Sequence, residues 1–456
     1  GFEKEMEKQR ERARATHKFD VAAKMGGAVK LDIKATQFTG YTCYEQQSSA
    51  IKILIDGVEA DKISKGQKAA IILDITPFYG EMGGQLGDTG TITGAKGKFI
   101  VTNTVHLTPE IILHQGEVAE GTITCGETVK AQVDIERRLD TARNHTATHL
   151  LQAALRQVLG GHIQQRGSSV GPERLRFDFS HLAAMTPDEL KSVQRIVNER
   201  IRQNLKVMAE EMGYKKAVES GATALFDEKY GDIVRVMRIG SPAVSAELCG
   251  GTHISGTGEI GFFQITSQGS VGAGVRRIEA VTGRAAEVYL GERLATLENT
   301  AKALETTPEK LPEKVAALTA EMEKGRKQAL ALERDAARKD AEALLNKVAE
   351  IKGVKVLAAR IETNDQQVLR EVADFLRDKL GSAIVVLGAV TNERPIFIAT
   401  VTPDLIEKGY SAGDIIKQVS KVAGGGGGGK PNFAQAGGKD ASKVDEAIAL
   451  VKTLIK

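Results

Sequence analysis

The residues best suited to chemistry are His145 and His149, followed about a hundred residues later by Cys249 and His253. Side chains four residues apart lie on one face of a helix, so the first two imidazoles can share one ion. In the second pair, Cys-Gly-Gly-Thr-His, two glycines permit positive φ and would let both ligands face inward. Three imidazole nitrogens and one thiolate suit a tetrahedral Zn²⁺ site. The spacing therefore predicts one bound zinc ion.

The alternative is that these are ordinary core or surface residues. It is disfavoured because the chain has only eight histidines and three cysteines, and four of these eleven form two spaced pairs. A zincin peptidase is excluded, because Thr146, Ala147 and Thr148 separate the first two histidines and no glutamate stands there as a base. Four protein ligands make a closed site, which is usually structural. The spacing leaves open whether the metal is catalytic.

Composition places the chain among globular proteins of several domains. Its 456 residues exceed what a single core holds, and it contains no apolar run long enough to span a bilayer. No secretory signal is visible and the three cysteines are scattered, so we expect a cytoplasmic protein without disulfides. The net charge of +3 is too small to indicate nucleic-acid binding by itself. Because the chain opens at Gly1 inside a charged helical pattern, we expect it to be a fragment.

The pattern along the chain predicts an α+β protein of five segments. Residues 1–27 are the helical end of an upstream region, and residues 28–135 form a β-barrel. Residues 136–283 form an α+β core that contains the zinc site. Residues 284–351 form an antiparallel helical hairpin, and residues 352–456 form a small α/β domain.

The barrel is predicted from short β-rich runs separated by turns such as Asp56-Gly57. The helix with the first two histidines spans residues 136–159, and a second helix spans 187–204 with Thr186 as its N-cap. We expect barrel strands at residues 29–33, 51–55, 69–75, 89–93, 99–105, 111–114 and 129–135. Further strands are expected at 174–179, 233–239, 261–267, 354–361, 383–387 and 395–401, and further helices at 365–380, 411–422 and 440–454.

The hairpin is predicted from heptad spacing of apolar residues, from Leu290 to Leu304 and again from Val315 to Ala343. Pro308 and Pro312 break the helix between the two runs. The charged outer positions favour a coiled coil that acts as a rigid spacer. A helix pair packed on a globular core is the alternative.

The glycine run at residues 424–429, followed by Lys430, fits the spacing of a nucleotide-binding loop but lacks its chemistry. Pro431 stands where such a loop needs Ser or Thr, and a helix rather than a strand is predicted before it. We interpret the run as a flexible or RNA-facing loop, at which Lys430, Phe433 and Lys439 would supply stacking and phosphate contacts. A mobile tether without a ligand is the alternative.

Three other segments are weaker candidates. Gln165 follows the metal helix and could reach a metal-bound substrate. Arg276 and Arg277 follow a glycine-containing turn and suit a phosphate or a nucleic-acid 3′ end. The glycine-dense stretch 77–88 is either a shaped loop near a pocket or a hairpin with a bulge. Solvated surface residues are the alternative reading of Gln165 and the two arginines.

Six segments together resemble, in order and over essentially the whole chain, the C-terminal half of bacterial alanyl-tRNA synthetases. CGGTH alone would also fit threonyl-tRNA synthetase editing domains or free-standing editing proteins, but the glycine-rich segment after a helical hairpin favours the alanine family. The segments are HTATHLL, RLRFDFSH, ALFDEKY, AELCGGTHISGTGEIG, GVRRIEAVTG and GGGGGGKPNFAQAGG.

The resemblance implies a proofreading activity, the hydrolysis of Ser-tRNA(Ala) and Gly-tRNA(Ala). It implies that the C-terminal domain binds tRNA(Ala) and forms a homo-oligomer, and that the ATP-dependent aminoacylation core lies upstream. A second site is needed because a pocket for alanine rejects glycine or serine by only roughly 1–3 kcal/mol.

The same resemblance gives His145, His149, Cys249 and His253 as zinc ligands and matches Gln165 to a polar residue of the editing site. Cys249 is also a candidate catalytic residue, because its exchange would open a position on the metal for water. Because four protein ligands leave no position for water without such an exchange, we hypothesise that the zinc shapes the pocket and that neighbouring groups hold the nucleophilic water.

Three other functions fit parts of the pattern. The chain could be a free-standing trans-editing deacylase, or a tRNA-binding module whose zinc is purely structural. A DHH-type phosphoesterase is disfavoured, because the sequence contains no Asp-His-His triplet.

Overall fold

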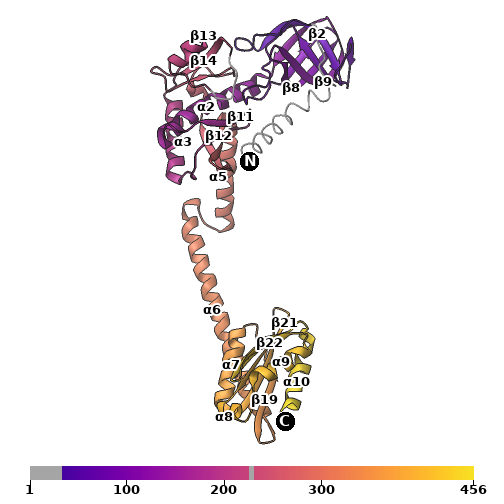
Figure 1. Cartoon of the computed structure of the whole chain (residues 1–456), viewed down its shortest axis with the longest axis vertical. Coiled ribbons are helices and arrows are strands. Elements are labelled where there is room, and N and C mark those ends of the chain that lie inside the picture. The colour runs from indigo at the N-terminus through magenta and orange to yellow at the C-terminus, as the bar shows by residue number, and fades with distance from the viewer. Residues whose placement is uncertain (1–32, 225–230, 456) are drawn as a thin grey trace, which may run out of the picture. The chain divides into compact units, whose positions relative to one another are not determined.

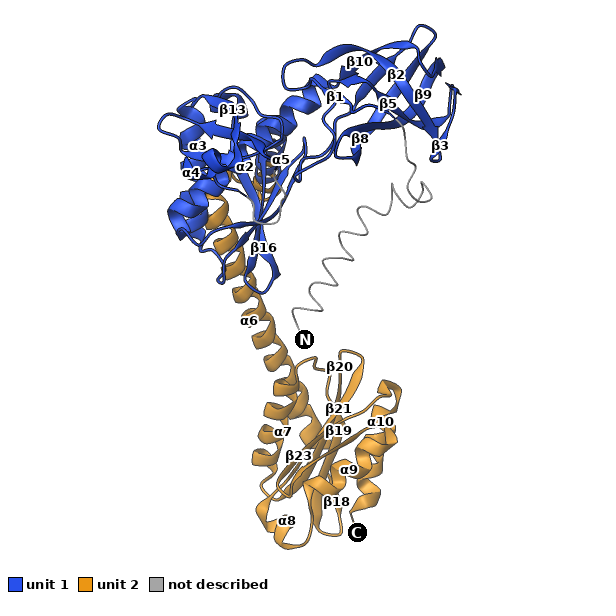
Figure 2. Ribbon diagram, turned by 45° about the horizontal axis from the view of Figure 1, so that its top comes forward, with its two compact units in different colours: residues 1–297 blue, residues 298–456 orange. Residues whose placement is uncertain are grey.

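The computed structural model describes residues 33–224 and 231–455, which fall into two compact units (Figures 1 and 2). Unit 1 is residues 1–297 and unit 2 is residues 298–456. The predicted helical end at 1–27 lies outside the described residues. So does the predicted strand at 29–33, apart from Ile33, which is not in a strand.

Unit 1 begins with a closed, six-stranded antiparallel barrel, which confirms the predicted barrel. The strand order is β10-β7-β8-β9-β5-β2, and pairing of β10 with β2 closes it. Aliphatic residues, Phe78 and Phe99 form its core. The strands are β2 (Glu45–Ile55), β5 (Lys68–Leu73), β7 (Gly90–Thr93), β8 (Gly97–Thr108), β9 (Ile111–Thr124) and β10 (Thr128–Val133), with short strands β1 (Gln37–Phe38), β3 (Val58–Glu59), β4 (Lys62–Ser64) and β6 (Ile75–Thr76) beside them.

The second part of unit 1 is an α+β core built on two helices. Helix α2 (Ile135–Leu159) begins where the Asp134 side chain accepts a hydrogen bond from the Arg137 amide. Helix α3 (Pro187–Arg202) begins at the predicted N-cap Thr186, which forms a capping box with Glu189. Both pack on the four-stranded sheet β11-β12-β17-β16. The strands are β11 (Gln165–Val170), β12 (Leu175–Ser180), β16 (Phe263–Gly272) and β17 (Val275–Thr282).

A separate three-stranded sheet, β13-β14-β15, carries the second ligand pair at its end. Its strands are β13 (Val207–Gly213), β14 (Ile233–Ile239) and β15 (Ser245–Leu248). Strand β15 ends one residue before Cys249, so the Cys-Gly-Gly-Thr-His turn leaves the sheet directly. The helix α4 (Tyr214–Glu219) and the 3-10 turn η1 (Thr257–Ile260) complete this part.

Two helices follow, as predicted, with the break between them at the prolines. Helix α5 (Gly283–Ala303) crosses the boundary between the units, and helix α6 (Leu311–Leu344) belongs to unit 2. The turn η2 (Pro308–Lys310) lies between them. The antiparallel pairing of the two helices stays a prediction.

Unit 2 is an α/β domain around a mixed sheet of order β18-β19-β20-β21-β23-β22, in which only β19 and β20 pair in parallel. Helix α7 (Gln366–Leu380) and the end of α6 cover one face of the sheet, and α9 (Ala412–Val422) and α10 (Val444–Leu454) cover the other. Helix α8 (Pro403–Glu407) follows β21. The strands are β18 (Ala349–Ile351), β19 (Val354–Arg360), β20 (Ala383–Thr391), β21 (Arg394–Val401), β22 (Gly426–Lys430) and β23 (Phe433–Gly437).

The glycine run is not a loop, so that prediction was wrong. Most of it forms the edge strand β22, which pairs with β23 from Gly426–Gly437 to Lys430–Phe433. A Cβ atom at Gly427 would lie 2.4 Å from the Cβ of Ala436, and one at Gly429 would lie 2.4 Å from the Phe433 carbonyl oxygen. These two glycines are therefore required by close approach of the strands. A run of glycines has no side-chain alternation from which a strand can be read.

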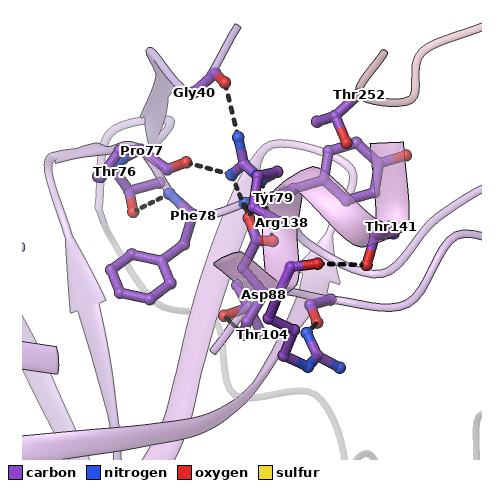
Figure 3. Close-up of polar contacts among 12 residues, drawn as sticks. Gly40, Thr76, Pro77, Phe78, Tyr79, Asp88, Thr104, Arg138, Thr141 and Thr252 are labelled. Carbon is purple, nitrogen blue, oxygen red and sulfur yellow. Dashed lines mark hydrogen bonds and ion pairs between the residues drawn. The ribbon is translucent and has the colours of Figure 1, made fainter. Parts of the chain in front are cut away.

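A buried ion pair joins the barrel to helix α2 (Figure 3). The Arg138 guanidinium donates to both carboxylate oxygens of Asp88, to the Gly40 carbonyl at 2.8 Å and to the Pro77 carbonyl at 2.7 Å. Asp88 also accepts from the Tyr79 amide at 2.7 Å. Both charged side chains are almost fully buried. The pair thus fixes the loop 77–88 against the start of the metal helix.

Replacement of Arg138 by alanine should lower the free energy of unfolding by about 3–5 kcal/mol, because it leaves the Asp88 carboxylate buried without its partner. Urea unfolding at neutral pH measures this. The control is Arg156→Ala, an exposed arginine on the same helix, which should change stability by at most about 0.5 kcal/mol. Equal effects of the two changes would contradict a stabilising role for the pair.

His114 makes the barrel sensitive to acid. Burial lowers its pKa to about 4, although a hydrogen bond to the Ile71 carbonyl opposes the shift. Since the folded-state pKa lies below the unfolded value of 6.5, the stability it contributes is present above pH 6.5 and is lost as the pH falls toward 4. Between pH 7.5 and 5 the loss should be about 2 kcal/mol.

Urea unfolding of His114→Gln at both pH values should show a smaller loss than the unchanged chain. The same change at the exposed His162 should keep the full loss. If His114→Gln and the unchanged chain lose the same free energy, another group causes the acid sensitivity.

Candidate metal centre

The structure brings the four predicted ligands together. One ligand atom from each of His145, His149, Cys249 and His253 lies within 4.8 Å of all the others. The Cys249 Sγ atom is 3.4 Å from Nε2 of His145 and 3.3 Å from Nε2 of His253. His145 and His149 are buried, and Cys249 and His253 are half-buried. A thiolate with three imidazoles is a donor set that suits Zn²⁺, so the residues fit that ion.

The glycines of the second pair act differently from the sequence expectation. Neither Gly250 nor Gly251 has a positive φ. Instead, a Cβ atom at Gly251 would lie 2.1 Å from Cε1 of His145, so the imidazole occupies the space of a side chain. Arg235 on β14 donates to the carbonyls of Cys249 and Gly251 at 3.0 and 2.8 Å and holds the turn. The glycine supplies room rather than an unusual backbone conformation.

Each imidazole has an outer partner at Nδ1. His145 meets Gln85 Oε1 at 2.7 Å, and His253 meets Thr146 Oγ1 at 3.0 Å. His149 lies 3.0 Å from Glu247 Oε2, an ion-pair distance without good hydrogen-bond geometry. Such partners fix ring orientation and tautomer, and on His145 and His253 they leave Nε2 facing the thiol.

The cluster favours a thiolate. Burial raises the pKa of Cys249, but the neighbouring His145 and His253 outweigh burial and bring it well below its usual value. Burial lowers the pKa of His149, but the Glu247 carboxylate and Cys249 outweigh this and raise it to about 10. Burial and His145 lower the pKa of His253 to about 3. Zinc needs the thiolate and neutral imidazoles, so His149 would release a proton on binding.

For residues 77–88 we predicted either a shaped loop or a hairpin with a bulge. The structure favours the shaped loop, because Gln85 in it forms a hydrogen bond with His145. Gln85, Glu247 and Arg235 were missed as site residues by sequence reasoning. The dense glycines around Gln85 are a signal for a shaped loop, but nothing in the sequence joins Gln85 to a histidine 60 positions later.

The other predicted site residues of unit 1 lie on the sheet of β11, β12, β16 and β17. Gln165 starts β11, is half-buried, and pairs with Phe179 next to a bulge. Among the described residues, no hydrogen bond joins its side chain to the four ligands. Arg277 is held by Asp178 through two hydrogen bonds of 2.7 and 2.8 Å, while Arg276 donates to Gln268 at 2.9 Å. Successive residues of a strand face opposite sides, so the two arginines do not form one patch.

The predicted residues of unit 2 gather around β22 and β23. Lys430 and Phe433 are paired at the turn between the strands. The Arg370 guanidinium lies 4.3 Å from the centre of the Phe433 ring, so one face of the ring is already covered. The amide of Lys439 donates to the Ala423 carbonyl at 2.8 Å.

Three protein families match parts of the chain. The family described as "Threonyl and Alanyl tRNA synthetase second additional domain" matches residues 234–279, which include Cys249 and His253. The family "tRNA synthetases class II (A)" matches residues 1–137, and the described part of this range is the barrel and the first residues of α2. The "DHHA1 domain" family matches residues 353–456, which is most of unit 2.

Curated relatives match the whole chain. An alanine–tRNA ligase from Dehalococcoides mccartyi (strain 195) is 55% identical over 458 residues, covering 100% of this chain and 53% of the relative. Alanine–tRNA ligases from Geobacillus thermodenitrificans and Bacillus subtilis are 45% and 44% identical, each covering 100% of this chain and 52% of the relative. The chain thus spans about half the length of the curated relatives it matches.

One solved structure with similarity is the C-Ala domain of alanyl-tRNA synthetase from Aquifex aeolicus. It is 28% identical, covers 24% of this chain and 96% of its own, and has a TM-score of 0.22. Among the described helices, none combines the length and the apolar character that a membrane span requires.

The purified chain should bind one zinc ion, measured by elemental analysis after dialysis. Cys249→Ala should release most of it, because loss of a thiolate leaves three neutral ligands. Cys125→Ala is the control, since Cys125 is also half-buried but lies in the barrel, where it packs against the core and donates a hydrogen bond to the Ile51 carbonyl. Equal zinc content in both variants would contradict the assignment of Cys249 as a ligand.

Proposed function

From the premise that this chain is related over its whole length to the C-terminal half of the alanine–tRNA ligases, we propose that unit 1 hydrolyses wrongly formed aminoacyl esters of tRNA(Ala). The substrates are Ser-tRNA(Ala) and Gly-tRNA(Ala). The observation that carries the proposal is the cluster of three histidines and one cysteine, half of which lies in the matched second additional domain.

His145, His149, Cys249 and His253 would hold the zinc, which when bound would polarise the ester or its water, or would shape the pocket. The chain's own residues set the geometry around it. Glu247 and Thr146 orient two of the imidazoles, and Arg235 holds the turn that carries Cys249. Gln165 is our candidate catalytic residue, and Cys249 would be one only if its exchange opened a position on the metal for water.

We assign to unit 2 the binding of tRNA(Ala) and the formation of a homo-oligomer in the cytoplasm. Lys430, Lys439 and the Phe433 ring with Arg370 on it are the candidate contacts in this unit. Arg276 is the candidate in unit 1, because Arg277 would have to give up its ion pair with Asp178 to bind a phosphate. The aminoacylation core, which uses ATP, is assigned to an upstream region.

A second function is favoured by the closed ligand set. Four protein ligands typically make a structural site, so the chain could bind tRNA without hydrolysing the ester. A free-standing trans-editing deacylase would share the hydrolytic site but lack the upstream core.

The experiment is deacylation of Ser-tRNA(Ala) and Ala-tRNA(Ala) by the chain, with and without a zinc chelator. We expect the seryl ester to be hydrolysed at least about tenfold faster, the scale of discrimination that a second pocket adds. The chelator should abolish the difference. Equal rates on both esters would remove the proofreading proposal.

tRNA binding, measured in parallel, separates the alternatives. Binding without hydrolysis of either ester identifies the structural-zinc module. Full deacylation by Cys249→Ala would exclude an essential role for that ligand.

A further inference from the structure

Gln85 joins three segments that are distant in the sequence. Its side chain is fully buried. The Oε1 atom accepts from Nδ1 of His145 at 2.7 Å and from the amide of Thr252 at 2.9 Å, while Nε2 donates to Thr252 Oγ1 at 2.9 Å. One amide therefore contacts both the metal helix and the Cys-Gly-Gly-Thr-His turn.

We propose that Gln85 is a positioning residue of the metal centre, through which the barrel loop sets the orientation of His145 and the register of the turn. An amide oxygen only accepts hydrogen bonds, so its contact requires the proton of His145 on Nδ1. Nε2 is then left with its lone pair toward Cys249. Gln85 also binds Thr252, which precedes the ligand His253, and so fixes the turn relative to His145. The barrel is thus part of the metal centre and not only its neighbour.

The loop can act in this way because it is fixed at two places. The two neighbours of Gln85, Gly84 and Leu86, form backbone hydrogen bonds of 2.8 and 3.0 Å with Val170 at the end of β11. Gly84 has φ of +83°, and a Cβ atom there would lie 2.5 Å from Ser168 Oγ, so only glycine fits. Three residues after Gln85, Asp88 is fixed by Arg138. The amide is therefore pre-positioned rather than recruited by a ligand.

The charge of the zinc-loaded site explains why position 85 holds a neutral glutamine and not a glutamate. With zinc bound, the Cys249 thiolate and the Glu247 carboxylate together balance the two charges of the ion. A glutamate in place of Gln85 would keep both acceptor contacts but would add a further negative charge in a buried place. A leucine would keep most of the volume and remove every polar contact.

The test compares Gln85→Leu and Gln85→Glu in the full chain, with zinc affinity measured by competition with a chromophoric chelator. Gln85→Leu should weaken zinc binding by about 10–100-fold, the usual effect of losing an outer partner of a metal ligand. Gln85→Glu should bind zinc at least as tightly as the unchanged chain, because the acceptor is retained and the added negative charge attracts the ion, while the cost of burying that charge lowers the stability of the zinc-free chain. The visible spectrum of the Co²⁺-loaded protein should change only in the leucine variant.

The matched control is Gln152→Leu. Gln152 is a second buried glutamine, on the metal helix itself, and its Oε1 atom has no hydrogen-bond partner among the described residues. Its loss should leave zinc affinity within about threefold of the unchanged chain, below the effect of an outer partner. Equal affinity of Gln85→Leu, Gln152→Leu and the unchanged chain would overturn the proposal.

A second readout remains if Gln85→Leu fails to fold. In the zinc-loaded chain, ¹⁵N-labelled histidine should show a protected Nδ1–H on His145, and Gln85→Glu should move that proton signal downfield because a charged acceptor binds it more tightly. The other seven histidines should keep their signals. An unmoved His145 signal would also overturn the proposal. The inference rests on the metal site and not on the ester hydrolysed, so an inactive chain that shows these effects would reject only the deacylase function.

Discussion

The buried ion pair between Arg138 and Asp88 is the interaction on which the arrangement of unit 1 depends. Removing two charges from water is costly, and the attraction between them offsets that cost only if their remaining hydrogen bonds are made. Here the guanidinium also donates to the Gly40 and Pro77 carbonyls, and the carboxylate accepts from the Tyr79 amide. Because these groups belong to the barrel side and Arg138 to α2, the pair can be satisfied in only one mutual placement of the two parts.

The placement of the barrel loop against α2 also sets the geometry of the metal centre, because the ion pair lies close in sequence to residues of that centre. Asp88 is three residues after Gln85, and Arg138 is two helical turns before His145 on nearly the same face of α2. A shift of the loop against the helix would separate Gln85 from His145, whose contact is 2.7 Å. The third segment, the turn after β15, is set by Arg235 from within its own sheet and by Gln85 from outside. Three independent pieces of chain thus meet through a few satisfied polar groups.

Whether a feature could be predicted from the sequence depends on how far apart in the chain its interacting residues lie. The ligand pairs are local patterns, and their helix and turn were found at the expected residues. The N-cap at Thr186 was found for the same reason. Gln85 and Glu247 act across the fold, so only tertiary structure brings them to the histidines. The glycines of the Cys-Gly-Gly-Thr-His turn and of the run 424–429 were misinterpreted, although those around Gln85 did indicate a shaped loop. Gly251 is required by the volume of an imidazole and Gly427 by a neighbouring strand, and neither cause is visible in a single chain segment.

The outer contacts also bear on whether the metal performs chemistry or builds the pocket. A ligand that is exchanged during turnover should be the one least constrained by its surroundings. Cys249 is not such a ligand, because the Gly251 amide lies 3.4 Å from its sulfur as a donor and Arg235 fixes its carbonyl. His145 and His253 are held at Nδ1 by hydrogen bonds, and His149 lies at ion-pair distance from Glu247. With all four ligands constrained, release of any one would break at least one further contact, which favours a metal that shapes the pocket while neighbouring groups hold the attacking water.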